Sequence, residues 1–200
     1  MVNFIPLVPE SPAFERVIDC YRDVWASAGE GEARTSVAER FSAHATYPGY
    51  RGVVALATDP DELAAAGVEG EDEAVLGYCY GYASRPDQYY HGLLRESLPV
   101  EEGDRWLADC FEFVELGVHV GARERGLGST LHDALLDGVE NATSLLTTGV
   151  ENDPARRFYE RRGWDVVHEP FESDDGRPYV VMGRSLGQDA GAAGSDRGRV

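Results

Sequence analysis

The sequence predicts an α/β (α+β) domain in which a mixed, mostly antiparallel β-sheet of about seven strands carries helices on both faces. Two observations predict this class. Strand-like stretches follow one another in the first half of the chain, which favours antiparallel hairpins; later, strands alternate with helical periodicity, which favours a parallel crossover. The 200 residues, 42% of them hydrophobic, suffice for one core. We expect one domain over residues 1–186 and a disordered tail over 187–200.

The first half of the chain supplies an opening strand, two helices and two further strands. The opening strand, over 3–8, is expected at a sheet edge because Pro6 has no N–H to give to a ladder. Apolar residues at three- and four-residue steps predict an amphipathic helix from Ser11, its cap, to about Ala28. The other expected elements are a weaker helix over 35–43, strands over 52–58 and 73–83, and an acidic loop or short helix over 59–72.

The second half begins with a long connection over 85–108, which we interpret as a loop ordered by its aromatic residues. The helix that begins at Asp153-Pro154 shows an acidic cap followed by proline, and Gly163 stands where a left-handed residue ends a helix. The remaining expected elements are strands over 110–120, 145–150, 164–169 and 178–186, and a helix over 126–139.

Acidic residues outnumber basic ones two to one, with 36 Asp and Glu against 18 basic residues and a net charge of −18. Every basic residue is arginine, which excludes Schiff-base lysine chemistry and any phosphate loop that needs lysine. Because a surface this acidic repels the phosphate backbones of nucleic acids, we expect no nucleic-acid partner. Self-repulsion of this size favours a salt-rich cytoplasm of the halophilic kind. The alternative is an ordinary acidic protein from a GC-rich genome that favours arginine codons.

The sequence gives no sign of a membrane or of a metal. No run approaches the roughly 18–20 apolar residues of a spanning helix, and the first residues lack a basic lead, so we expect a soluble, cytoplasmic protein. Cys20, Cys79 and Cys110 are widely spaced, without a CxxC pair or Cys/His ligand spacing. We therefore expect three reduced thiols and no metal site.

A strand that enters a glycine-rich turn and then a helix, over residues 118–130, carries the chemistry. Glycines at 126 and 128 let the backbone turn its N–H groups toward one point, and the helix N-terminus adds unpaired donors and a partial positive charge. Together they predict a site for a phosphate or pyrophosphate. Arg123 and Arg125 add local positive charge to an acidic chain. The alternative is an ordinary tight strand-to-helix turn.

Two well-known phosphate loops do not fit this segment. A Walker loop needs lysine where Leu127 stands, and a dinucleotide fingerprint needs glycine where Leu131 stands. The pattern Arg-x-x-Gly-x-Gly that begins at Arg123 instead resembles the acyl-CoA pyrophosphate loop of the GNAT superfamily of N-acyltransferases.

A second segment is similar to the strand–helix signature of the same family. Asn152 stands at a strand end, Ala155 follows three residues later, and the pairs Phe158-Tyr159 and Gly163-Trp164 complete the pattern. The resemblance covers roughly residues 73–186 and implies an acetyl-CoA-dependent N-acetyltransferase, in which an amine of a small molecule or protein attacks directly in a ternary complex. It also implies a possible homodimer. A non-catalytic acyl-CoA sensor or assembly module with the same fold is the alternative.

The resemblance further implies roles for single residues. Val118 and Val120 would offer backbone groups to the pantetheine arm, and Asn152 would hydrogen-bond it or splay two strands apart. Tyr159 would protonate the leaving thiolate as general acid; packing between helix and sheet is the alternative for this ring. Backbone N–H groups would cradle the pyrophosphate at Arg123, Arg125, Gly126, Leu127, Gly128 and Ser129.

Glu115 is the first candidate for general base. Strict alternation puts it on one strand face with Phe113, and puts Val114 on the other. A carboxylate among apolar neighbours needs a partner or access to water, or has a raised pKa. A salt bridge to an arginine, or solvation at the end of the sheet, is the alternative. Glu112, on the opposite face, is second. His119 is third, with a purely structural histidine as its alternative. The resemblance also implies that a water chain could replace all of them.

Aromatic residues of the third strand and the long connection are the candidates for the acceptor pocket. Single aromatic residues more often pack in a core, but as a group they favour a site for a cationic amine on an acidic protein. The residues assigned to substrate binding are Tyr78, Tyr80, Tyr90 and Trp106, with Tyr82 and Tyr89 nearby.

Overall fold

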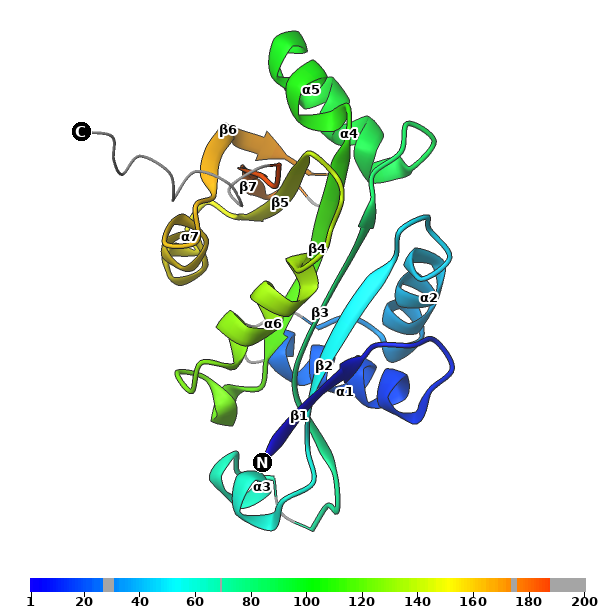
Figure 1. Ribbon diagram of the computed structural model, residues 1–200, viewed down its shortest axis with the longest axis vertical. Helices are drawn as coiled ribbons and strands as arrows, with labels where there is room; N and C mark the ends of the chain where they lie inside the picture. The colour runs from blue at the N-terminus through cyan, green and yellow to red at the C-terminus, as the bar shows by residue number, and fades with distance from the viewer. Residues whose placement is uncertain (27–30, 69, 174–175, 188–200) are drawn as a thin grey trace, which may run out of the picture. The chain divides into compact units, whose positions relative to one another are not determined.

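The computed structural model describes residues 1–26, 31–68, 70–173 and 176–187. Its seven strands form one sheet in the order β1-β2-β3-β4-β5-β7-β6 (Figure 1). The strands are β1 (Val2–Pro6), β2 (Arg51–Ala57), β3 (Ala74–Ala83), β4 (Cys110–Val118), β5 (Thr143–Gly149), β6 (Asp165–Glu172) and β7 (Pro178–Ser185). The helices are α1 (Pro12–Ala26), α2 (Arg34–His44), α3 (Pro60–Ala65), α4 (Tyr89–Ser97), α5 (Val100–Leu107), α6 (Leu127–Leu136) and α7 (Asp153–Glu160), and η1 (Val120–Ala122) is a 3-10 turn.

The four strand pairs β1/β2, β2/β3, β5/β7 and β6/β7 are antiparallel, which confirms a mostly antiparallel sheet. The chain divides into two compact units: residues 1–83 with 112–139, and residues 84–111 with the described residues from 140 on. The expectation of one domain over 1–186 stays a prediction. From residue 188 on, the expected tail lies outside the described residues, as does the expected helix end at Ala28.

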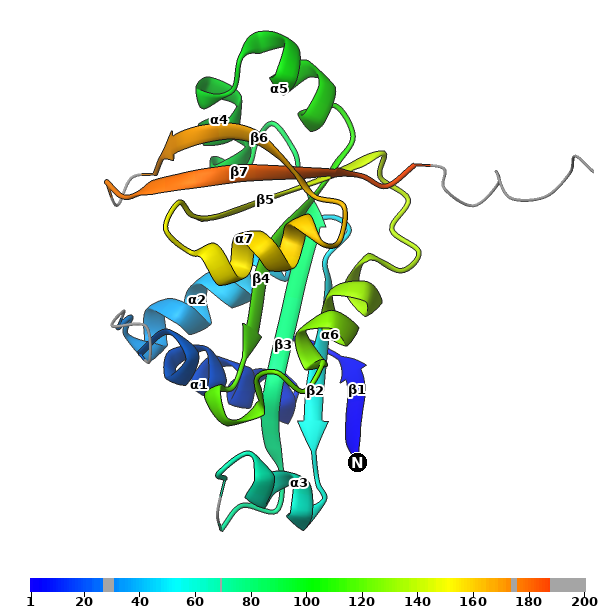
Figure 2. The ribbon, with the colours of Figure 1, turned by 90° about the vertical axis from the view of Figure 1, so that its left-hand side faces the viewer.

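The first unit places helices on both faces of its strands. Figure 2 shows α1 and α2 on one side of β2–β4, and α6 on the other. On the α1/α2 side, Val17, Ile18 and Phe41 pack against strand residues that include Tyr78 and Tyr80. The Ser11 hydroxyl accepts a hydrogen bond from the N–H of Phe14 at 3.2 Å, as expected of the cap of α1. The α6 side has its own core: Ala57, Leu63, Ala66, Leu76, Ala122 and Leu127.

The second unit packs α4 and α5 with β5, β6 and β7. Its core holds Leu94, Leu98 and Trp106 from the helical region with Leu145 and Phe171 from the strands. Among the described residues, no helix is long and apolar enough to cross a bilayer.

The structure corrects the expected loop over 85–108, because most of it is helical. The segment forms α4 and α5, and Pro99 stands between them as the N-cap residue of α5. Both helices are short, and Gly92 and Gly103 interrupt their sequences, which hid the helical period. The buried side chains of Leu94 and Trp106 show what stabilises them: packing against the second core rather than helix propensity.

The cap of α7 lies one residue earlier than expected. The Asn152 side chain, not that of Asp153, accepts the hydrogen bond from the N–H of Ala155, at 3.3 Å, and Asp153 is the first helical residue. The end of the helix is as predicted. Gly163 has φ +77°, and the N–H of the next residue donates to the carbonyl of Tyr159 at 3.2 Å.

Strict alternation along β4 was also a wrong expectation. Glu112 contacts Tyr82, which packs on α2, while Phe113 packs on His132 of α6 and Val114 against the α1/α2 core. Glu115 contacts Arg40 of α2. The side chains of Val114 and Glu115, although neighbours in sequence, therefore both lie on the α1/α2 side. An extra residue in a strand has this effect. Glu112 and Glu115 therefore lie on the same face of the strand, whereas strict alternation had placed them on opposite faces.

Candidate active site

The turn between β4 and α6 presents backbone donors to solvent. Residues 123–126 are exposed, and Glu124 and Gly126 have left-handed backbones, with φ of +62° and +83°. The backbone N–H groups of residues 124–128 donate no hydrogen bond within the described part of the chain; that of Ser129 donates to the Gly126 carbonyl at 3.0 Å. A run of free N–H groups at a helix N-terminus can bind an anion, so the turn has the donors that a pyrophosphate needs.

The turn is held in place by a close backbone approach at Gly121. A Cβ built on Gly121 would lie 2.1 Å from the carbonyl oxygen of Ala66, just after α3. Only glycine fits such a contact. Ala122, fully buried, and Leu127, 8% exposed, anchor the two ends of the turn in the core beneath it. The sequence motif predicted Gly126, whose φ requires glycine, but contained no signal for Gly121.

Both arginines of the turn already have partners. The Nε of Arg123 donates to the Val118 carbonyl at 3.2 Å, and Arg125 forms an ion pair with Glu62 of α3. The backbone carbonyl of Val118, which the sequence analysis assigned to pantetheine binding, thus already accepts a hydrogen bond from the Arg123 side chain. Val120 is 57% exposed. The positive charge expected beside the phosphates is present, but Glu62 offsets that of Arg125.

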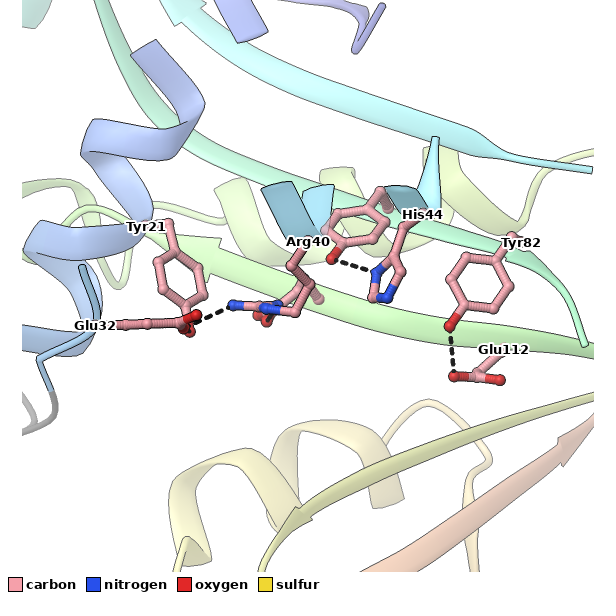
Figure 3. Close-up of polar contacts among 8 residues, drawn as sticks. Tyr21, Glu32, Arg40, His44, Tyr82 and Glu112 are labelled. Atoms are coloured by element: carbon pink, nitrogen blue, oxygen red, sulfur yellow. Dashed lines mark hydrogen bonds and ion pairs between the residues drawn. The ribbon is translucent and has the colours of Figure 1, made fainter. Parts of the chain in front are cut away.

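A second group of polar side chains lies on the α1/α2 side of the first unit (Figure 3). Arg40 of α2 stands at its centre. Its Nη1 donates to Oε1 of Glu115 at 3.2 Å and its Nη2 to Oε2 of Glu32 at 3.0 Å. The hydroxyl of Tyr21 donates to the same Glu32 oxygen at 3.2 Å. Glu115 therefore forms the salt bridge to an arginine that the sequence analysis gave as an alternative to its role as general base.

The pKa of Glu115 lies well above that of an ordinary glutamate. Burial raises it to about 7, Arg40 opposes the rise, and Glu32 adds to it. The side chain is 13% exposed. A carboxylate that titrates near neutral pH and keeps some access to solvent has the properties of a general base.

Next to this group, two tyrosines of β3 make hydrogen bonds of their own. The Tyr80 hydroxyl lies 3.1 Å from Nδ1 of His44, and the Tyr82 hydroxyl donates to Oε1 of Glu112 at 2.9 Å. Burial and then the charge of Arg40 lower the pKa of His44 to about 4, so this imidazole is neutral at pH 7. His119, the third candidate base, caps η1: its Nδ1 accepts a hydrogen bond from the N–H of Gly121 at 3.3 Å.

Tyr78 is fully buried, and no partner is found for its hydroxyl among the described residues. Its ring and hydroxyl occupy the space beside Gly117 of β4, where a Cβ would lie 2.5 Å from the ring. Burial raises the pKa of Tyr78 well above the ordinary value, so it stays neutral. Tyr78 and Tyr80, both predicted to bind substrate, are 0% and 1% exposed; that role stays a prediction.

The remaining predicted residues lie in the second unit. Asn152 caps α7, as described above. Tyr159 is 8% exposed, and its ring packs at right angles to Phe158 and beside Trp164. The Tyr90 hydroxyl lies 2.5 Å from that of Thr147, and Trp106 donates from Nε1 to Glu102 at 2.9 Å. Their roles toward substrate or acetyl donor stay predictions.

The sequence reading missed Arg40, Glu32 and Tyr21. Arg40 and Glu115 are separated by 75 positions, and α2 was the weakest expected helix, so no motif or period joined them. Within the residues that the structure describes, no group of three or more His, Cys, Asp or Glu side chains could hold a metal ion.

Comparisons with known proteins agree with the motifs. The profile described as the acetyltransferase (GNAT) family matches residues 18–164. A GCN5-like protein acetyltransferase of Mycobacterium tuberculosis is 33% identical over 141 residues, which are 66% of this chain and 68% of that protein.

Solved structures share the fold. One is NAA60 of Arabidopsis thaliana in complex with a bisubstrate analogue, with a TM-score of 0.63, 19% identity, and 92% of this chain and 99% of that chain covered. Ard1 of Thermoplasma volcanium matches with a TM-score of 0.58, 18% identity and coverages of 92% and 97%.

Proposed function

The chain belongs to the GNAT family of acetyltransferases, and from this premise we propose that it moves an acetyl group from acetyl-CoA to a primary amine of a small molecule or protein. The observation that carries the proposal is the run of free backbone N–H groups over residues 124–128, at the start of α6. These donors suit the two phosphates of coenzyme A, with Arg123 adding charge. The side chain of Leu127 points into the core and leaves the donors uncovered.

The proposed reaction is a direct attack in a ternary complex. The amine nitrogen forms a bond to the thioester carbonyl carbon, and the backbone N–H of Val118 stabilises the oxyanion of the tetrahedral intermediate. The carbon–sulfur bond then breaks, and Tyr159 gives its phenol proton to the leaving thiolate. The proton lost by the attacking nitrogen goes to Glu115, whose pKa of about 7 allows it to accept and release protons near neutrality.

The first unit also supports a cationic acceptor. Glu112, Glu115 and Glu32 serve the same α1/α2 side, beside the rings of Tyr80 and Tyr82. Glu115 and Glu32 share the single positive charge of Arg40, so the group keeps a net negative charge, which attracts an ammonium group. We place the reaction in the cytoplasm, because Cys20, Cys79 and Cys110 are buried free thiols.

Titration calorimetry with acetyl-CoA tests the phosphate turn. Gly126→Trp should weaken binding at least tenfold, because the indole covers the free N–H groups. Gly138→Trp is the matched control: Gly138 also has a left-handed backbone, with φ +69°, and open space around it, but it lies at the far end of α6. Unchanged affinity in Gly126→Trp, or equal loss in both variants, would contradict the assignment.

Release of free thiol in the presence of a panel of amines tests turnover. An acetyltransferase releases coenzyme A only with an acceptor amine. Binding without release by any amine would favour the alternative, a non-catalytic acyl-CoA sensor.

A further inference from the structure

Arg40 connects two carboxylates that belong to different parts of the first unit. Glu115 lies on β4, whereas Glu32 lies in the segment that precedes α2. One guanidinium nitrogen contacts each of them, at 3.2 and 3.0 Å, as Figure 3 shows for the side toward Glu32. Tyr21 of α1 donates to the same Glu32 oxygen as Arg40, at 3.2 Å. A single positive charge is therefore shared between two negative ones.

The guanidinium has little freedom to leave this position. It lies over the ring of Tyr21, 5.0 Å from its centroid, and over that of Phe41, at 5.3 Å. Stacking on two rings and two charge-assisted contacts fix its plane. Although burial disfavours the cation, the neighbouring carboxylates of Glu115 and Glu32 raise the pKa of Arg40, so its charge is permanent.

Glu112 lies on the same face of β4 as Glu115, three residues earlier, and accepts a hydrogen bond from the Tyr82 hydroxyl. The other described groups beside Glu115 carry no charge near pH 7. Tyr21 from α1 and Tyr78 and Tyr80 from β3 are phenols whose pKa burial raises above its ordinary value. His44 of α2, beside Tyr80, is neutral. Among the described residues, Arg40 and Glu32 are the charges that act most strongly on Glu115, and they act with opposite sign.

We propose that Arg40 and Glu32 are positioning residues that set, in opposite senses, the pH at which Glu115 takes up a proton and thereby the pH at which the enzyme works. This inference rests on the proposed role of Glu115 as general base. Arg40 favours the ionised carboxylate that can accept a proton. Glu32 offsets part of the positive charge of Arg40 and repels the Glu115 carboxylate. Both effects favour the protonated form of Glu115.

The two residues should move the acid limb of kcat/KM in opposite directions. In Arg40→Gln the limb should move to higher pH by about 1–3 units, the size typical of losing an opposite charge at this range. In Glu32→Gln it should move to lower pH by less, because Glu32 is partly solvated, with 38% of its side chain exposed. Arg40→Lys keeps the charge and should restore most of the shift. The titration of the acceptor amine is the same in every variant and cancels.

Arg34→Gln is the matched control. Arg34 begins the same helix and forms two ion pairs, with Glu15 and Asp19, both at 2.7 Å and both outside the Arg40 cluster. Its loss should leave the acid limb in place. A second readout needs no activity: carbon-13 NMR of the Glu115 carboxyl, assigned with Glu115→Gln, follows its titration directly in the protein without substrates.

The outcomes separate this inference from the proposed function. Opposite shifts of both the NMR titration and the acid limb support the inference. An NMR titration that is unchanged, or that moves the same way in both variants, overturns it. Opposite NMR shifts with an unmoved acid limb overturn the claim that this pair governs activity, and show that Glu115 is not the base. If Arg40→Gln does not fold, Glu32→Gln alone still tests the inference. A Glu115 titration that moves to higher pH in Glu32→Gln, or does not move, contradicts it.

Discussion

Gly121→Ala tests whether the close approach of two backbones holds the phosphate turn in place. The added Cβ would lie 2.1 Å from the Ala66 carbonyl oxygen and 2.8 Å from its carbonyl carbon. Ordinary contacts of this kind are 3.4 Å or more. Because the obstacle is backbone, no side chain can rotate away, and the turn or the end of α3 must shift by more than an ångström.

The cost of that shift can be estimated from overpacked cores. One inserted carbon with nowhere to go costs about 1–3 kcal/mol. For a chain of this size each kcal/mol lowers Tm by about 2–4 °C. We therefore expect a fall in Tm of about 2–12 °C by differential scanning calorimetry, together with at least tenfold weaker binding of acetyl-CoA by titration calorimetry.

Gly92→Ala is the control, because Gly92 lies within α4 and has open space around it. Alanine there should stabilise the helix by up to about 1 kcal/mol and leave binding unchanged. If Gly121→Ala keeps both the Tm and the affinity of the parent protein, the contact with Ala66 does not position the turn, and the reasoning is refuted.

Three further predictions follow from other parts of the molecule. Tyr159→Phe should lower kcat at least about 100-fold with nearly unchanged acetyl-CoA affinity, because only the proton donor is lost; unchanged kcat in the thiol-release assay would exclude Tyr159 as the acid. Tyr78→Phe should leave the free energy of unfolding unchanged or raise it, because the buried Tyr78 hydroxyl has no partner among the described residues. Tyr80→Phe should lower the free energy of unfolding by about 0.5–1.5 kcal/mol, because the contact with His44 is lost. Urea unfolding compares the two variants, and an equal loss in both would contradict this difference. The net charge of −18 should make the unfolding midpoint rise as salt increases toward 1 M, where the screening length falls to about 3 Å; a midpoint that falls would contradict the expected adaptation to salt.

Local sequence signals predicted the parts of the fold that depend on few neighbouring residues. The left-handed backbones of Gly126 and Gly163 follow from the motif and from the helix end, and the antiparallel pair β2/β3 follows from consecutive strands. The helices α4 and α5 could not be found in this way. Their stability comes from Leu94, Leu98 and Trp106 in a core shared with strands far away in the sequence.

The candidate site shows the same division between local and long-range information. The phosphate turn is continuous in sequence, so its residues could be named in advance. The surroundings of Glu115 could not, because the alternation of β4 is interrupted at Val114 and Glu115, and because Arg40 reaches it from a weakly periodic helix. A strand irregularity leaves no period to detect, and an ion pair across the fold leaves no spacing.

The most direct test of the account is a crystal structure of the protein with acetyl-CoA bound. We predict that the pyrophosphate oxygens lie within hydrogen-bond distance, about 2.7–3.2 Å, of several backbone nitrogens of residues 124–128. Phosphates bound elsewhere, with these nitrogens facing only solvent, would contradict it.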